Sequence, residues 1–458
     1  MADLDLRGAA LRGDTVNTLA VVGAGWAGLS TAVHAARAGL RVHLVERAPF
    51  GGGRAREARI DFGAGPVAVD AGQHLLMGAY RECLRLAAIA HGAAAPPLRR
   101  TALALRDTAG LRLEARARRA PWHLLGALAG ARGLSLRERW AALRLVAALR
   151  ARGWRTPAGE TVSALLARHR QPRTLVERLW SPLCIGAMNT APESACAGAF
   201  AAVLRDTLGA ERAASDFVLP ETTLDAAITR PALGWLRAHG GAVSFGTNVR
   251  AVRRAGPHWR IETAGATLEA SQLVVATPPA DAARLLEPLD PRAQALARFT
   301  YEPIATVLLE WPRDALLPLP DWTLLHDDGR RAWGQWLFDR GCIGAHRIAA
   351  VVVSAASRLG ATTREALGEA VAHQVARQLE LPLPRAHRTV IERRATIRCT
   401  PDRPRIACDA FADALPGLWL AGDYVDDEYP ATLETAVRSG RRAAERVRAA
   451  QPQAASSA

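Results

Sequence analysis

Apolar and polar positions near the N-terminus follow a pattern that predicts a strand, a helix and a second strand. Residues 18–22 (TLAVV) form a short apolar run that ends in glycines. Residues 26–39 continue with helical spacing and close on a glycine, and residues 41–45 (RVHLV) form a second apolar run. This order of elements predicts the beginning of a βαβ unit.

The middle of the chain is mainly helical in pattern, and the part that follows is rich in strands. Ser135 and Glu138 stand in capping-box spacing at the start of a helix expected over 134–152. Further helices are expected at 161–169, 224–239 and 363–379, and short strand-like runs are frequent from residue 242 to residue 398. A last strand at 418–422 leads through a glycine into a helix over 432–449. The arrangement of strand, glycine and helix therefore occurs at both ends of the chain.

Three glycines after the first strand form the motif G-x-G-x-x-G, as Gly23, Gly25 and Gly28. The first allows a tight turn, the second lets a pyrophosphate approach the backbone, and the third lets helix and strand pack closely. Free N–H groups at the start of the helix attract phosphate. Glu46 ends the second strand, where a carboxylate accepts hydrogen bonds from an adenosine ribose and disfavours a 2′-phosphate. This segment predicts a site for FAD or NAD and disfavours NADP.

A second signal favours FAD over NAD. Gly52, Gly53 and Arg54 follow soon after Glu46 and offer another close backbone approach, with a guanidinium for the phosphates.

A third signal lies near the C-terminus. Gly422 and Asp423 follow the last strand, where the carboxylate can accept hydrogen bonds from a ribityl chain or hold phosphate-bound water. The helix that begins near Thr432 directs its positive end to the same region, where it would stabilise negative charge on a reduced flavin.

Composition and charge narrow the choice of partners only slightly. The 59 basic residues outnumber the 44 acidic ones, and every Lys or Arg position holds arginine. Such complete replacement of lysine indicates a coding bias more than a binding function. Attraction to anionic membranes stays open, whereas nucleic-acid binding lacks a supporting motif.

The six cysteines form no C-x-x-C pair, and no histidine cluster accompanies them, so no metal site is expected. The first 17 residues lack the apolar segment of a secretory signal, and no apolar run reaches the length of a membrane span. We therefore expect a cytoplasmic protein, with peripheral contact at the inner face of the cytoplasmic membrane as an open alternative.

The three motifs together resemble the flavin amine oxidase and phytoene desaturase superfamily. Two stretches, 70–80 (DAGQHLLMGAY) and 180–206 with PLCIGAMNT at its centre, are similar to the squalene-associated FAD-dependent desaturases, which are hydroxysqualene dehydroxylases of hopanoid biosynthesis. Residues 392–400 (ERRATIRCT) and the ending GDYVDDEYPATLETAVRSG resemble the same group. The likeness covers about residues 17 to 448. Ala71 departs from the asparagine of that family's D-N-G-Q-H.

The resemblance implies a particular set of cofactor contacts. It assigns FAD binding to the glycines, acids and arginine above, and backbone contact with adenine to Val249. It places the 72–74 segment near the isoalloxazine ring and the helix start at its pyrimidine edge, which adds Gly72, Gln73, Ala431, Thr432 and Leu433 to the cofactor site.

The reaction implied by the resemblance replaces an allylic hydroxyl of hydroxysqualene with hydride from reduced flavin, through an allylic cation housed in an apolar pocket. A group must help the hydroxyl leave as water. His74 is the first candidate, with Asp427 and Glu428 behind it, and Asn189 is a candidate for lining the substrate pocket. A histidine that only hydrogen-bonds backbone, and an ordinary loop amide, are equally compatible with the sequence.

Several alternatives stay open on the sequence. The electron donor is either NAD(P)H or a carrier protein, since no second nucleotide motif is visible. A carotenoid-type desaturase acting on a phytoene-like substrate is the runner-up activity, and a non-catalytic prenyl-binding carrier is the alternative of another class. A hydrolase is disfavoured, because G-x-S-x-G does not occur.

The predicted fold is mixed α/β, with a Rossmann-like FAD-binding domain interleaved with a substrate domain of helices and a β-sheet. The FAD domain is expected to comprise residues 17–85, 215–285 and 405–450. The substrate domain is expected to comprise residues 86–214 and 286–404.

Overall fold

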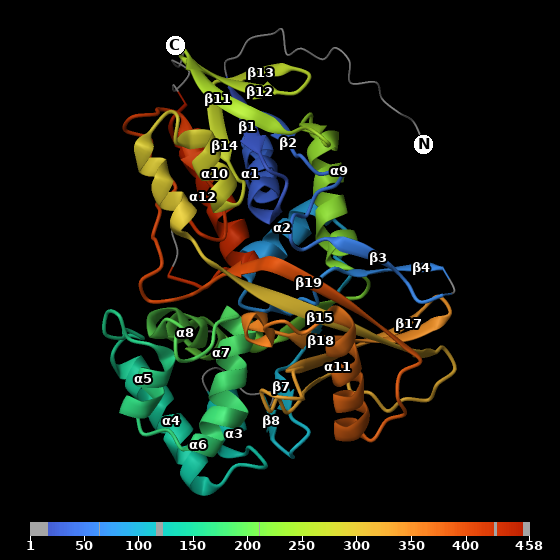
Figure 1. Ribbon diagram of the computed structural model, residues 1–458. Coiled ribbons are helices and arrows are strands. Elements are labelled where there is room, and N and C mark those ends of the chain that lie inside the picture. Colours follow the sequence, from blue (N-terminus) through green and yellow to red (C-terminus); the bar gives the residue numbers. More distant parts are fainter. Residues whose placement is uncertain (1–16, 64, 116–121, 210, 426–427, 452–458) are drawn as a thin grey trace.

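The computed structural model describes residues 17–63, 65–115, 122–209, 211–425 and 428–451 (Figure 1). The parallel sheet contains the first and the last strand of the fold. Its strand order is β10 (Ala242–Ser244), β2 (Arg41–Val45), β1 (Thr18–Val22), β14 (Gln272–Val275) and β20 (Leu418–Leu420). All neighbouring strands in it run parallel. The N-terminal strand thus lies in the same sheet as the strand that precedes Asp423.

Helices cover this sheet, and most of the residues that they bury are small or aliphatic. The helix α1 (Trp26–Arg37) packs against α12 (Leu433–Ala449), which in turn contacts α2 (Arg81–His91). Helix α9 (Arg230–Ala238) packs against α2 and α1. The first and last helices of the fold are therefore neighbours, and both begin at the end of the sheet where the parallel strands finish.

A second sheet of five antiparallel strands faces the parallel sheet and its helices. Its order is β16 (Trp322–Leu324), β17 (Trp336–Ile343), β18 (His346–Val353), β15 (Tyr301–Pro312) and β19 (Ala386–Ile397). Helix α11 (Arg364–Leu379) covers one side of this sheet (Figure 1). The long strands β15 and β19 run beneath the parallel sheet and its helices, which brings them to the cavity described below.

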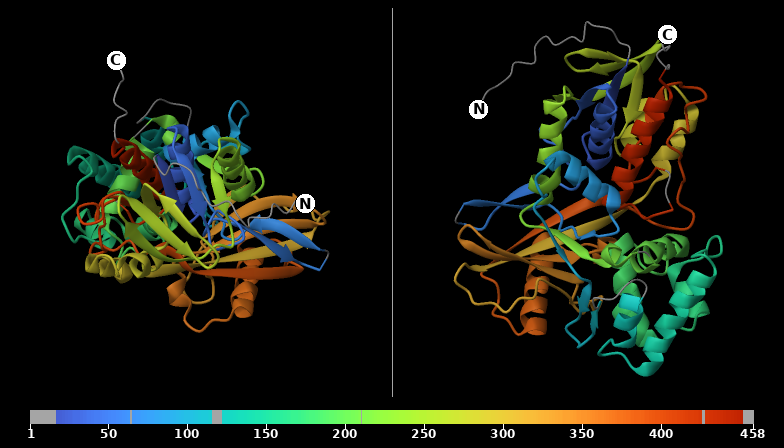
Figure 2. Two further views of the ribbon diagram at one scale, coloured as in Figure 1. Left: turned by 90° about the horizontal axis from the view of Figure 1, so that it is seen from above. Right: turned by 180° about the vertical axis from the view of Figure 1, so that it is seen from behind.

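A group of helices packs beside the antiparallel sheet, at the end of the molecule away from both termini (Figure 2). Its members are α3 (Trp122–Ala129), α4 (Leu136–Ala151), α5 (Val162–Arg168), α6 (Arg173–Leu175), α7 (Ser181–Met188) and α8 (Ala197–Leu204). Ser135 caps α4 and exchanges hydrogen bonds with Glu138, which confirms the capping box expected there.

The remaining elements connect these layers. The small sheets comprise β3 (Glu57–Asp61) with β4 (Pro66–Asp70), β5 (Leu76–Met77) and β6 (Leu98–Thr101) with β9 (Phe217–Pro220), β7 (Ala104–Arg106) with β8 (Arg112–Glu114), and β11 (Val249–Ala255), β12 (His258–Thr263) and β13 (Thr267–Ala270). Helix α10 is Pro279–Leu286, and short π- or 3₁₀-helical turns occupy Val176–Trp180, Arg205–Gly209, Arg212–Ser215, Asp225–Thr229, Pro291–Arg298 and Ala356–Leu359.

The architecture confirms the predicted mixed α/β fold. One hydrophobic cluster joins the parallel sheet with its helices, and others fill the helical group and the antiparallel sheet. The hairpin of β3 and β4 packs on the antiparallel sheet, although the predicted boundaries assign it to the other domain. Those domain boundaries stay a prediction. Within the described residues, no helix combines the length and apolarity needed to cross a bilayer.

Candidate active site

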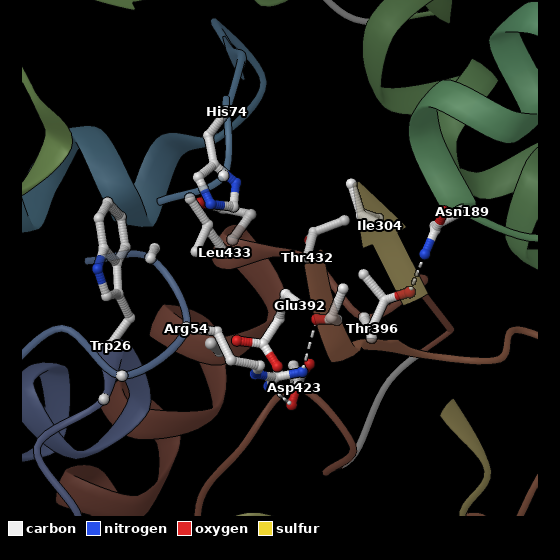
Figure 3. Close-up of a pocket in the computed structure, with 18 of the residues that line it drawn as sticks. Trp26, Arg54, His74, Asn189, Ile304, Glu392, Thr396, Asp423, Thr432 and Leu433 are labelled. Atoms are coloured by element: carbon white, nitrogen blue, oxygen red, sulfur yellow. Dashed lines mark hydrogen bonds and ion pairs between the residues drawn. The ribbon is translucent and has the colours of Figure 1, made fainter. Parts of the chain in front are cut away.

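A deep cavity lies between the parallel sheet, the antiparallel sheet and the helical group (Figure 3). Its volume is about 540 Å³. Most of the residues predicted to bind the cofactor or substrate line it, from six separate parts of the chain: Gly23, Gly25, Glu46, Gly52, Gly53, Arg54, Gly72, Gln73, His74, Asn189, Val249, Gly422, Asp423, Ala431, Thr432 and Leu433. The fold therefore gathers motifs that are far apart in sequence at one site.

The glycine loop between β1 and α1 has the geometry that the motif requires. Gly23 has a φ of +106°, which favours glycine. A Cβ on Gly28 would lie 1.8 Å from the carbonyl oxygen of Gly23, so this glycine is needed for close packing and does not line the cavity. A Cβ on Gly25 would meet no protein atom within 4 Å. Open space above Gly25, and an α1 N-terminus without a side-chain cap, fit a bound pyrophosphate.

Glu46 follows β2 and holds the glycine loop. Its Oε2 accepts a hydrogen bond of 2.7 Å from the backbone N–H of Ala24, and its Oε1 accepts one of 2.8 Å from that of Ala48. Each carboxylate oxygen has a second lone pair, so Glu46 can also accept hydrogen bonds from a ribose. The acid predicted to contact the nucleotide therefore shapes the loop as well.

Arg54 and Asp423 pair with each other, which the sequence did not predict. Nη2 of Arg54 lies 2.7 Å from Oδ1 of Asp423, whose side chain is buried. Nη1 of Arg54 donates to the carbonyl oxygen of Ala395, in β19. This ion pair connects the segments after β2 and β20 with the antiparallel sheet, and the expected contact of Arg54 with phosphate stays a prediction. Burial opposes the charge on Arg54, but Asp423 outweighs it and raises the pKa of the guanidinium.

The start of α12 is fixed where it faces the cavity. Thr432 is the N-cap, and its hydroxyl accepts a hydrogen bond from the N–H of Thr435. The carboxylate of Glu434, in the first turn, accepts hydrogen bonds from the N–H groups of Glu82 and Cys83 at the start of α2. Two helix N-termini are therefore joined by one buried acid, which holds Thr432 and Leu433 in place. Glu434 was not predicted.

His74 lines the cavity as expected, but its protonation state does not suit the predicted acid. Its Nε2 atom is buried and makes no hydrogen bond within the described residues. Burial, with a smaller contribution from the charge of Arg54, lowers the pKa of His74 to about 4. A pKa this low favours the neutral imidazole at pH 7 and disfavours the predicted role of His74 as a cationic proton donor.

Asn189 borders the cavity but is engaged in holding the fold. It ends α7 in a left-handed conformation, with a φ of +46°. Its amide group donates to the carbonyl oxygen of Glu302 and to the hydroxyl of Thr396, and its oxygen accepts from the N–H of Ala355. These three bonds join the helical group to the antiparallel sheet, so the side chain is not free to bind substrate.

Of the two acids proposed behind His74, the described structure places Glu428, which does not line this cavity. Glu428 is 73% exposed and pairs with Arg205 at 3.4 Å. It lines a separate, smaller cavity beside the site. Its predicted catalytic role is therefore not supported. Glu428 is close in sequence to Asp423, but its side chain lines the smaller cavity and not the main one. Asp427 lies outside the described residues.

The structure adds residues that sequence reasoning did not assign. Glu392 and Thr396, on β19, face the cavity from the antiparallel sheet, and Figure 3 shows Glu392 beside Arg54. Both belong to the stretch 392–400, whose resemblance to known proteins was the only signal in the sequence. The same cavity also has an apolar part, called the apolar chamber below, which is lined by α3, α7, α8 and β17, including Leu124, Leu128, Leu183, Phe200, Trp336 and Phe338.

Comparison with known sequences gives a consistent picture. The sequence pattern of the family described as flavin containing amine oxidoreductase matches residues 26–448. A hydroxysqualene dehydroxylase of Rhodopseudomonas palustris is 31% identical over 451 residues, which cover 94% of this chain and 99% of that protein. The hydroxysqualene dehydroxylase of Sinorhizobium fredii is 28% identical, covering 93% of this chain and 97% of that protein.

Solved structures with similar folds include two oxidases. Cyclohexylamine oxidase from Brevibacterium oxydans superposes with a TM-score of 0.68 at 16% identity, covering 95% of this chain and 99% of that one. Wild-type putrescine oxidase gives a TM-score of 0.67 at 16% identity, covering 94% of this chain and 99% of that one. At these sequence identities the similarity shows a shared fold and nothing more.

Proposed function

Because this chain belongs to the family of flavin containing amine oxidoreductases and is an FAD-dependent enzyme, we propose that it converts hydroxysqualene to squalene by reductive dehydroxylation. The curated relatives of nearly equal length carry the name of that activity. The observation that carries the proposal is the continuity of the glycine-lined groove with the apolar chamber in one cavity.

The chamber suits a long hydrocarbon with a single polar group. Aliphatic and aromatic side chains form its walls, so the apolar part of the substrate would leave water there. The polar side chains of the cavity gather at the other end, around Arg54 and Thr396 (Figure 3). A substrate that enters with its hydrocarbon in the chamber would therefore present its hydroxyl group toward the glycine-lined groove.

The reaction requires one proton and one hydride for each hydroxyl group removed as water. When bound in its reduced form, FAD would supply the hydride, and the proton that leaves with the hydroxyl group as water would come from solvent. An apolar wall around the allylic carbon excludes water, which would otherwise add to the cation and restore the alcohol. Neutral His74 lines the cavity and can position the departing hydroxyl group, in place of the proton-donating role predicted from the sequence. We propose that the reducing equivalents come from NAD(P)H or from a carrier protein.

Product analysis tests the proposal directly. The purified holoenzyme is incubated anaerobically with hydroxysqualene and a chemical reductant such as dithionite, and the products are identified by mass spectrometry. We expect squalene, formed in proportion to the reductant consumed. A parallel reaction contains phytoene and an oxidant. Desaturated products in that reaction, with no squalene in the first, would overturn the proposal in favour of a carotenoid-type desaturase.

A further inference from the structure

An exposed apolar hollow lies on the outer side of helix α3. Trp122, Leu125 and Ala129 line it from α3, and Trp140 and Ala147 are among the residues that line it from α4. Trp122 is 65% exposed and Trp140 is 72% exposed, and Leu136 beside them is also 72% exposed. Two exposed tryptophans and a leucine on neighbouring helices form a continuous apolar surface, which monomeric soluble proteins rarely leave uncovered.

Helix α3 separates this hollow from the apolar chamber. Leu124 and Leu128 are buried and line the main cavity, whereas Trp122, Leu125 and Ala129 line the outer hollow. Residues four apart lie on one side of a helix, so these two sets occupy different sides of α3. One short helix thus has an apolar inner face toward the chamber and an apolar outer face toward the surroundings.

Positive charge accompanies the apolar surface. Arg137 and Arg144 lie on the same side of α4 as Trp140, because they precede and follow it by three and four residues. Both are exposed, and neither forms an ion pair with an acid within the described residues. Arg144 donates to a backbone carbonyl oxygen, that of His169. The surface therefore combines tryptophan, leucine and uncompensated arginine.

We propose that the face formed by α3 and α4 docks on an anionic lipid bilayer. Tryptophan side chains prefer the boundary between headgroups and acyl chains, and arginines beside them are attracted by anionic headgroups. The apolar lining of the chamber behind α3 suits an apolar molecule, and such a molecule dissolves in a lipid bilayer. A bilayer is therefore favoured over a protein as the partner of this face. That supply of substrate rests on the proposed function, whereas the docking itself does not.

Vesicle sedimentation tests the docking with the full-length holoenzyme and no substrate. The vesicles contain phosphatidylcholine with or without about a third of phosphatidylglycerol. We expect the holoenzyme to sediment with the anionic vesicles. The double variant Trp122→Ser/Trp140→Ser should lose about tenfold or more of its partition coefficient, and Arg137→Glu/Arg144→Glu should lose binding in the anionic vesicles.

Matched variants elsewhere on the surface control for general effects. Leu316→Ser removes an apolar side chain that is 98% exposed, and Arg330→Glu/Arg331→Glu reverses charge on an exposed loop. Neither should change vesicle binding. Unchanged binding of the tryptophan variant would overturn the proposal. The proposal would also be overturned if the holoenzyme did not bind the vesicles and light scattering showed that it self-associates through these tryptophans.

A second measurement separates docking from the proposed activity. The tryptophan variant should turn over hydroxysqualene normally in detergent micelles, and slowly when the substrate is embedded in anionic vesicles. Equal loss in both media would contradict a role for this face in access to the bilayer. If the wild-type enzyme produces no squalene in either medium, the proposed function fails while the sedimentation result still decides the docking.

Discussion

The guanidinium of Arg54 lies 2.7 Å from the carboxylate of Asp423, and this ion pair joins the segment after β2 to the segment after β20. Arg54 also donates to the backbone of Ala395 in β19. Three parts of the chain that surround the cavity are therefore held together by one side chain. The geometry of the cofactor site is set by the protein's own contacts.

Replacing Asp423 with asparagine should destabilise the protein and weaken its retention of FAD. The substitution leaves the charge of Arg54, whose side chain is 34% exposed, without its partner. We expect a cost of about 1–3 kcal/mol, between that of a surface pair and that of a fully buried one. We expect a lower thermal unfolding temperature and less flavin absorbance per protein after gel filtration. The matched control is Asp413→Asn, since Asp413 pairs with Arg292 at 2.8 Å but is 68% exposed. Its expected cost is under about 1 kcal/mol, so equal effects of the two variants would contradict this account.

Alanine at two neighbouring glycines should have different consequences. In Gly25→Ala the new methyl group meets no protein atom within 4 Å, so the variant should fold normally but bind FAD at least about tenfold more weakly, because the methyl group occupies space expected for the pyrophosphate. In Gly28→Ala the methyl group would lie 1.8 Å from a backbone oxygen, so the variant should be unstable even without cofactor. Circular dichroism and flavin fluorescence titration distinguish the two outcomes. Normal FAD affinity in a folded Gly25→Ala variant would show that the cofactor lies elsewhere.

Substitutions of Asn189 test whether it holds the fold or binds substrate. Asn189→Ala removes three buried hydrogen bonds and should lower the free energy of unfolding by about 2–4 kcal/mol. Asn189→Gly loses the same bonds but adopts the left-handed conformation more easily, so it should be about 1 kcal/mol more stable than the alanine variant. Denaturant unfolding gives both values. A normal unfolding free energy with a raised KM would instead assign Asn189 to the substrate.

The low pKa of His74 predicts a contribution to stability that depends on pH. The pKa is about 4 in the folded protein, against an ordinary value of 6.5. Between these values the unfolded chain binds a proton that the folded chain does not, so the contribution is lost as the pH falls from 6.5 toward 4. The stability of His74→Gln relative to the wild type should therefore rise by about 2 kcal/mol between pH 7 and pH 5.

Denaturant titrations of both proteins at several pH values provide the measurement. A parallel pH dependence in the two proteins would show that His74 is not the neutral, buried group described above. In the activity assay at pH 7, His74→Gln should keep more than about a tenth of the wild-type rate if the imidazole only orients the hydroxyl group. A loss of a thousandfold with full FAD content would restore His74 as the proton donor.

The sequence alone determined the elements that depend on local patterns. The glycines at positions 23, 25 and 28 and the acid at 46 predicted the nucleotide loop, because the motif states which backbone positions need glycine and where a carboxylate follows. The capping residue of α4 was also predicted, since a cap bonds to a backbone group only three residues away. The mixed α/β fold followed from the order of these elements.

Only the tertiary structure decided which side chains face the cavity and which are already engaged. Arg54 and Asp423, expected as cofactor contacts, also pair with each other, and Asn189, which lines the cavity as expected, also joins two layers. Glu428 stands within the C-terminal motif yet faces solvent. The physical reason is that a side chain's partners, burial and pKa depend on residues distant in sequence, and these become neighbours only when β19, α7 and α12 close around the same cavity.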